Sequence, residues 1–232
     1  MGSVGYKDNP TRWLCGCSLI SERYVLTAAH CTDGGGPALY VRLGELDVDS
    51  EWDDARPVIM RVSKRINHPG YVSNIGYNDI ALMQLERDAT FNAYVRPACL
   101  PVTWEIPDQT AIATGWGHTT YGEWYAGKQS NDLRKVRLKL VSTERCQSVY
   151  GSAPKIPQGL KNESMLCAGE EEGKDTCQSD SGGPLQTPLK KPYCMYNIVG
   201  VTSFGKACGS AAPSVYTRVS YFVPWIESIV WP

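Results

Sequence analysis

This sequence of 232 residues has almost no net charge and contains only three histidines and three phenylalanines. It also lacks long apolar runs. Its 23 lysines and arginines stand against 24 aspartates and glutamates, which gives a formal net charge of −1 at pH 7. Such a balance provides no electrostatic bias toward nucleic acid or an anionic membrane surface. No apolar run approaches the roughly 20 residues that cross a bilayer, and the opening MGSVGYKDNP lacks the apolar core of a signal peptide.

Cysteine, in contrast, is abundant, with nine residues. This number predicts disulfides in a secreted, extracellular protein, and an odd count leaves one cysteine for an outside partner. Zinc binding is the alternative, but Cys15-Gly16-Cys17 is tighter than the usual zinc spacing and the other cysteines stand singly. The sequon Asn162-Glu163-Ser164 agrees with secretion, and we expect a glycan on Asn162.

Short segments rich in branched and aromatic residues, bounded by turn formers, dominate the chain. They predict strands at 24–29, 38–43, 58–62, 136–141 and 198–202. Helical patterns are confined to 142–150, with Ser142 or Thr143 as N-cap, and to the C-terminus, where Pro224 fits a first turn. We therefore predict an all-β protein of two packed sheets or barrels closed by a C-terminal helix.

Three residues have the chemistry of a nucleophile, a base and an orienting acid. A serine hydroxyl attacks only when a base, usually a histidine held by a buried carboxylate, removes its proton. His30 ends the apolar run LTAAH, whereas His68 and His118 stand in turn-like and glycine-rich stretches. Asp79 opens the run DIALM, so its carboxylate enters a buried strand and needs a donor, either histidine, arginine or backbone. Ser181 precedes GGP, which lets backbone approach closely and leaves the serine amide free to face a substrate.

Together these residues resemble the chymotrypsin-type serine proteases, over nearly the whole chain. The matching motifs are LTAAHC at 26–31, NDIAL at 78–82, GWG at 115–117, DSGGP at 180–184 and VYTRV at 215–219. The resemblance implies a trypsin-like domain over 1–232, built of two packed six-stranded antiparallel β-barrels with lobes at roughly 1–103 and 104–232. It also implies that Ser181 attacks, His30 moves the proton and Asp79 orients the imidazole.

The same resemblance assigns a substrate pocket. Asp175 matches the carboxylate at the pocket floor, which implies cleavage after Arg or Lys. Ser203 and Gly205 match the pocket wall, with Gly205 leaving it open. Ser214 stands where trypsin-like members usually have glycine, so we expect a narrower pocket.

Two departures from the family concern activation. Asp180 matches the aspartate that pairs with the new N-terminal amine of the cleaved zymogen. The family's Ile-Val-Gly-Gly start has no counterpart here, because Met1–Thr11 matches a later stretch, so we expect a domain truncated at its N-terminus and weak as a protease. Ser179 replaces the glycine that completes the oxyanion hole with Ser181; we expect its side chain to turn that peptide, and losing one such donor costs about 10²–10³ in turnover.

The cysteines refine the resemblance. It implies three disulfides, namely Cys15–Cys31, Cys146–Cys167 and Cys177–Cys208. Cys99 matches the cysteine that joins the catalytic domain to an upstream clip or pro-segment, and in that case Cys17 and Cys194 are left for each other. Cys194 and the run GVTSFGK at 200–206 are most similar to arthropod clip-domain proteases of the snake type, which act in developmental and immune cascades.

Cofactors and partners are implied only in outline. Residues 45–54 form an acidic loop that begins, at Glu45, where some family members bind calcium; a solvated acidic loop is the alternative. No other cofactor is expected. The implied partners are protein substrates, themselves zymogens, and serpin-type inhibitors.

Two functions of different classes remain. The first is a secreted trypsin-like endopeptidase that activates another zymogen in an extracellular cascade. The second is a non-catalytic protease-like binding module, or an inactive truncated fragment of a protease. An intact set of His30, Asp79 and Ser181 favours the enzyme, whereas a purely structural disulfide-rich protein would explain none of the motif order.

Overall fold

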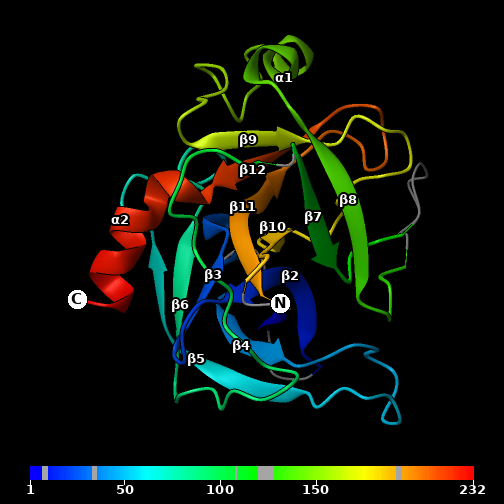
Figure 1. Cartoon of the computed structure of the whole chain (residues 1–232), viewed down its shortest axis with the longest axis vertical. Coiled ribbons are helices and arrows are strands. Elements are labelled where there is room, and N and C mark those ends of the chain that lie inside the picture. Colours follow the sequence, from blue (N-terminus) through cyan, green and yellow to red (C-terminus); the bar gives the residue numbers. More distant parts are fainter. Residues whose placement is uncertain (7–9, 33–35, 108, 120–127, 192–194) are drawn as a thin grey trace.

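A computed structural model describes residues 1–6, 10–32, 36–107, 109–119, 128–191 and 195–232. These residues form two closed barrels of six strands each, in which every neighbouring pair is antiparallel (Figure 1). The first barrel contains, in order around it, β1 (Gly2–Tyr6), β2 (Arg12–Leu19), β3 (Tyr24–Thr27), β6 (Ala81–Leu85), β5 (Val58–Asn67) and β4 (Ala38–Leu43). The second contains β10 (Pro184–Pro188), β11 (Tyr196–Phe204), β12 (Ser214–Arg218), β9 (Met165–Ala168), β8 (Arg134–Val141) and β7 (Thr110–Gly115). The predicted two-barrel, all-β fold is confirmed.

Helices are few, as the sequence predicts. A 3₁₀ turn covers Ala29–Cys31, and α1 (Thr143–Tyr150) begins after Ser142, whose hydroxyl caps it by accepting from the Arg145 N–H. The C-terminal helix α2 spans Val219–Val230 and starts earlier than expected, so Pro224 lies inside the helix and not in its first turn. That part of the sequence-based prediction was wrong, because strand β12 passes into the helix without an intervening turn.

Apolar side chains of the described residues form three buried clusters, and α2 belongs to the one that fills the first barrel and also includes Ile198 and Val201 of β11. Its buried Phe222 and Ile226 join the cluster that contains Leu26, Leu82 and Val41. Figure 1 shows α2 beside the strands of the first barrel, although it directly follows the last strand of the second. The end of the chain therefore ties the two barrels together, while the predicted lobe boundary near residue 103 lies in the connection from β6 to β7.

A glycine-lined contact joins the barrels near the serine-containing loop. The Gly16 N–H in β2 donates to the Ser181 carbonyl over 2.7 Å. A Cβ on Gly16 would lie 2.7 Å from the Gly183 Cα, and one on Gly182 would lie 2.2 Å from the Thr27 Oγ1. Since Thr27 Oγ1 itself donates to the Gly16 carbonyl at 2.8 Å, it cannot move aside without losing a buried hydrogen bond. Backbone-to-backbone packing thus fixes the position of Ser181 relative to the first barrel.

We predict that Gly182→Ala destabilises the fold more than Gly173→Ala does. Both glycines have a left-handed backbone, with φ of +77° and +78°, but a Cβ at Gly173 would meet no atom within 4 Å. The two variants share the backbone strain of about 1 kcal/mol, and overpacking adds roughly 1–3 kcal/mol at Gly182 alone. Denaturant unfolding measures the difference, and equal losses of stability would contradict the proposed close contact.

Candidate active site

His30 and Asp79 meet at the edge of the first barrel. The 3₁₀ turn after β3 presents His30, and the chain just before β6 presents Asp79. The His30 Nδ1 lies 2.8 Å from the Asp79 Oδ2, and the His30 backbone N–H donates to Oδ1 over 3.0 Å. Two bonds to one carboxylate fix both the turn and the plane of the imidazole, which leaves Nε2 directed away from Asp79.

The second barrel completes the surroundings of Asp79. The Ser203 hydroxyl in β11 donates to Oδ2 over 2.5 Å, and the Thr217 hydroxyl in β12 donates to the Asp79 carbonyl over 2.7 Å. Asp79 is only 3% exposed, and burial pushes its pKa up. The hydrogen bonds from His30 and Ser203 outweigh that effect, so the net pKa lies below its usual range and the carboxylate stays charged.

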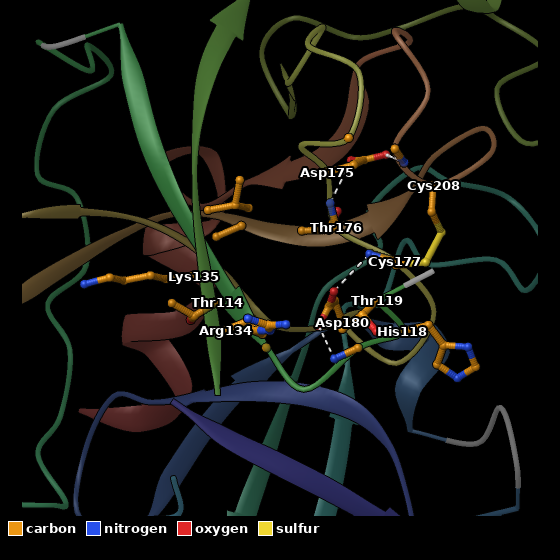
Figure 2. Close-up of a pocket in the computed structure, with 16 residues that line it drawn as sticks. Thr114, His118, Thr119, Arg134, Lys135, Asp175, Thr176, Cys177, Asp180 and Cys208 are labelled. Carbon is orange, nitrogen blue, oxygen red and sulfur yellow. Dashed lines mark hydrogen bonds between the residues drawn. A yellow bond between two sulfur atoms is a disulfide. The ribbon is translucent and has the colours of Figure 1, made fainter. Parts of the chain in front are cut away.

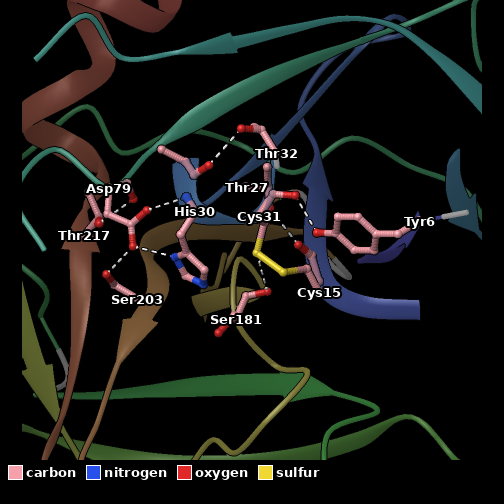
Figure 3. A network of polar contacts seen from close by, with 12 residues as sticks. Tyr6, Cys15, Thr27, His30, Cys31, Thr32, Asp79, Ser181, Ser203 and Thr217 are labelled. Carbon is pink, nitrogen blue, oxygen red and sulfur yellow. Dashed lines mark hydrogen bonds and ion pairs between the residues drawn. A yellow bond between two sulfur atoms is a disulfide. The ribbon is translucent and has the colours of Figure 1, made fainter. Parts of the chain in front are cut away.

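Ser181 lies beside the imidazole, at the junction of the barrels. Figure 3 shows Ser181 on the side of the His30 ring opposite Asp79. Its carbonyl is held by Gly16, as described above, and the next residue, Gly182, donates to the Thr202 carbonyl over 2.8 Å. Among the described residues, the His30 Nε2 has no hydrogen-bond partner. In enzymes without bound substrate, the distance between the catalytic serine and histidine is often too long for a hydrogen bond and shortens when substrate binds. The three residues singled out in the sequence are thus brought together in space.

Ser179 takes the backbone conformation that glycine usually holds. Its φ is +75°, in the left-handed region, so the side chain has not displaced the peptide as the sequence led us to expect. Within the described part of the chain, neither the Ser179 nor the Ser181 N–H has an acceptor. Two neighbouring free amides next to a serine hydroxyl are the donors that an oxyanion hole needs.

We predict that Ser179→Gly stabilises the protein by up to about 1 kcal/mol and does not lower turnover, because glycine takes a positive φ without strain. Ser179→Pro is the opposing variant. Its ring holds φ near −65° and removes the N–H, so turnover should fall about 10²–10³-fold. Unfolding and peptide-cleavage rates measure both variants. A glycine variant with reduced turnover would show that the serine side chain itself contributes.

Asp175 lies in the second barrel among donors. It accepts from the Thr176 N–H at 2.8 Å, the Ser214 hydroxyl at 2.7 Å and the Gly209 N–H at 3.2 Å. Burial raises its pKa, and these three hydrogen bonds offset only part of that rise. Ser214 also faces Gly205, since a Cβ on Gly205 would lie 2.7 Å from its Oγ. The Ser214 side chain therefore occupies space between Asp175 and Gly205, whereas the Ser203 hydroxyl is directed to Asp79 and leaves only its backbone for a substrate.

A cavity of about 360 Å³ reaches both Asp175 and Asp180. Figure 2 shows the two carboxylates with the Cys177–Cys208 disulfide and His118 nearby. Asp180 accepts from the Gly117 N–H at 2.8 Å and the Cys177 N–H at 2.9 Å, but no cation pairs with it among the described residues. Burial raises its pKa to about 6, so near neutral pH the site is poised to accept a positive charge.

The structure contains the disulfides Cys15–Cys31, Cys146–Cys167 and Cys177–Cys208. Cys17 is a free, fully buried thiol, and burial raises its pKa to about 12. The suggested bond from Cys17 to Cys194 cannot be followed, because Cys194 lies outside the described residues. Cys99 is a half-buried free thiol. The sulfur atoms of Cys15 and Cys31 lie near His30, but they are bonded to each other and offer no thiolate to a metal.

Several carboxylates of the acidic loop have partners within the protein, and calcium binding there stays a prediction. Glu45 pairs with Arg42 over 3.4 Å, and the Arg42 guanidinium lies 4.5 Å from the centre of the Trp13 ring. Asp53 accepts from the Asp47 and Ala55 N–H groups, so its oxygens cap the loop backbone. These carboxylates are directed to internal donors and do not converge on one point.

His68 and Asn162 make contacts of a structural kind, and one contact of the active site was not predicted from the sequence. The His68 ring packs edge-on against Phe222 and Trp225, with centroid distances of 5.0 and 5.1 Å, and burial lowers its pKa. The Asn162 Oδ1 accepts from the Thr143 hydroxyl, and its glycosylation stays a prediction. Sequence reasoning missed Thr217 as a partner of Asp79, although it stands in the motif VYTRV that was singled out.

A His–Asp pair facing a serine where two antiparallel barrels meet defines a protease of the chymotrypsin type. Residues 1–226 match the trypsin family, so the chain belongs to that family of serine proteases. Serine protease snk of Drosophila melanogaster is 42% identical over 98% of this chain, which covers 51% of that protein. Phenoloxidase-activating factor 1 of Holotrichia diomphalia is 36% identical over 99% of the chain, which covers 66% of it. The solved structure of neuropsin, a serine protease of mouse brain, aligns with a TM-score of 0.80 and 31% identity, over 99% of this chain and 93% of that one.

The chain thus spans between half and two thirds of the length of these two insect relatives. Among the described helices, none has the length and apolar character needed to cross a membrane.

Proposed function

We propose that this domain is a secreted serine endopeptidase that cleaves after Arg or Lys. The observation that carries the proposal is the pair of bonds from His30 to the buried Asp79, with Ser181 on the other side of the imidazole. Asp175, a half-buried carboxylate whose pKa is raised by burial and which accepts from Ser214, supports the preference for a basic residue.

The geometry supports an acyl-transfer mechanism. The Ser181 hydroxyl attacks the scissile carbonyl while His30 Nε2 takes its proton, and the same nitrogen then protonates the leaving amine. Asp79, held charged by its donors, keeps Nδ1 protonated and stabilises the imidazolium that forms. The free N–H groups of Ser179 and Ser181 would bind the oxyanion. Water then repeats the attack on the acyl group and regenerates the serine.

The direct test is labelling with a fluorophosphonate, which reacts only with an activated serine. We expect one label per chain in the activated protein, on Ser181, and none in Ser181→Ala. Failure to label, with the fold intact, would favour the alternative of a non-catalytic protease-like binding module.

We predict that Asp175→Ser abolishes the preference for Arg and Lys, because a buried guanidinium or ammonium would lose its charge partner. Ser214→Gly is the matched control. It removes a hydrogen bond to Asp175 and widens the pocket but keeps the carboxylate, so the preference should persist. Chromogenic peptides ending in Arg, Lys, Phe or Ala measure it, and equal turnover of Arg and Phe peptides by the unsubstituted enzyme would overturn the assignment.

We further propose that Asp180 receives an N-terminal amine on activation. The cavity beside its unpaired carboxylate supports this role. We predict that the dipeptide Ile-Val raises the Tm of this chain at pH 7.5 and much less at pH 5, because the pKa of Asp180 is about 6 and its protonation removes the charge that pairs with the amine. N-acetyl-Ile-Val has no amine charge and should have no effect. An equal shift with the acetylated peptide would contradict the ion pair.

The biological role that fits best is activation of another zymogen in an extracellular cascade. Two relatives bear names of such factors, phenoloxidase-activating factor 1 and the β subunit of clotting factor G from Tachypleus tridentatus, the latter 38% identical over 97% of this chain. The free thiol of Cys99 supports a disulfide to an upstream clip or pro-segment. Serpin-type inhibitors are the expected regulators.

A further inference from the structure

A second cavity, of about 480 Å³, is lined by His30 but not by Ser181. Its walls include His30, Asp79, Gly76, Phe204 and Lys155. We propose that Lys155 makes this cavity a subsite for an acidic side chain of the substrate, on the N-terminal side of the basic residue that is cleaved. This inference rests on the proposed peptidase function and adds the residue that would determine its further specificity.

Gly76 packs closely against the Phe204 ring, and both residues line the cavity. A Cβ at Gly76 would lie 2.5 Å from the Phe204 Cε1, so any larger residue would collide with the ring. The Gly76 N–H donates to the Lys155 carbonyl over 2.7 Å, which ties the loop carrying Lys155 to the segment leading to Asp79. These contacts hold Gly76, Phe204 and Lys155 together in the wall of the cavity.

Lys155 supplies the unsatisfied charge of the cavity. Its Nζ lies 5.5 Å from the centre of the Phe204 ring, and no carboxylate pairs with it within the described residues. The other charged wall residue besides His30 is Asp79, whose oxygens are taken by His30 and Ser203. Lys206 donates to the Val149 carbonyl over 2.8 Å and does not line the cavity. A carboxylate entering here would thus meet one free ammonium group.

The end of β11 determines which substrate residues reach this cavity. Phe204 lines it, whereas the next residue, Gly205, faces Ser214 and so the side of Asp175. A substrate extended along this strand alternates its side chains in the same way. With the cleaved Arg or Lys directed to Asp175, the second and fourth residues before the cleaved bond share the face toward Lys155. We infer that Glu or Asp is favoured at one or both positions.

The test uses the activated protease and peptides with Arg before the cleaved bond and Glu, Gln or Lys at the second or the fourth position. We expect kcat/KM to be about two- to fivefold higher for Glu than for Lys, the size of an exposed ion pair, and the ratio to shrink at high salt. Lys155→Glu should invert the ratio. Lys139→Glu, an exposed lysine on β8 with the same change of charge, should leave it unchanged.

Each outcome is decisive. No difference between Glu and Lys peptides, or equal effects of Lys155→Glu and Lys139→Glu, would overturn the subsite while the cleavage of Arg peptides still supports the proposed function. Cleavage of none of the Arg peptides, by a protein whose fold is intact, would overturn the proposed function and the subsite with it.

Discussion

The buried carboxylate of Asp79 is the group on which the site and the packing of the two barrels depend. Its donors come from the turn after β3 and from β11, while Thr217 in β12 holds its carbonyl. Removing one partner of a buried charge costs several kcal/mol, so these bonds oppose any displacement of one barrel relative to the other. The same bonds that satisfy the charge orient the imidazole, and stability and chemistry are therefore coupled at this residue.

A second constraint is the close approach of two backbones. Gly16 and Gly183 touch across the barrel interface, and the Gly16 N–H holds the Ser181 carbonyl. The nucleophile is thus positioned by its main chain, independently of the His30–Asp79 pair. Two separate attachments to the first barrel allow the hydroxyl and the imidazole to face each other without a direct bond in the free protein.

The second barrel contains two carboxylates that are not fully stabilised in their charged form. Asp180 is buried and Asp175 half-buried beside one cavity, and burial raises the pKa of each. A cation bound next to either carboxylate would stabilise its charged form and lower its pKa. The physical basis for binding a basic side chain and for accepting a terminal amine is therefore the same. The two carboxylates also interact, since the negative charge of Asp175 helps to raise the pKa of Asp180.

The sequence alone predicted an all-β fold, because apolar alternation and turn residues are local properties of the chain, and the resemblance of its motifs to the chymotrypsin-type proteases pointed to His30, Asp79 and Ser181 as the reacting residues. It correctly predicted α1 with its Ser142 cap, but it placed Pro224 in a first turn, since the start of α2 depends on how the helix packs against the first barrel. The left-handed backbone of Ser179, the bond from Ser203 to Asp79 and the cavity at Lys155 were decided only by tertiary structure. Each of them depends on contacts between residues far apart in the chain, and no local pattern encodes which distant group will fill or leave open a given space.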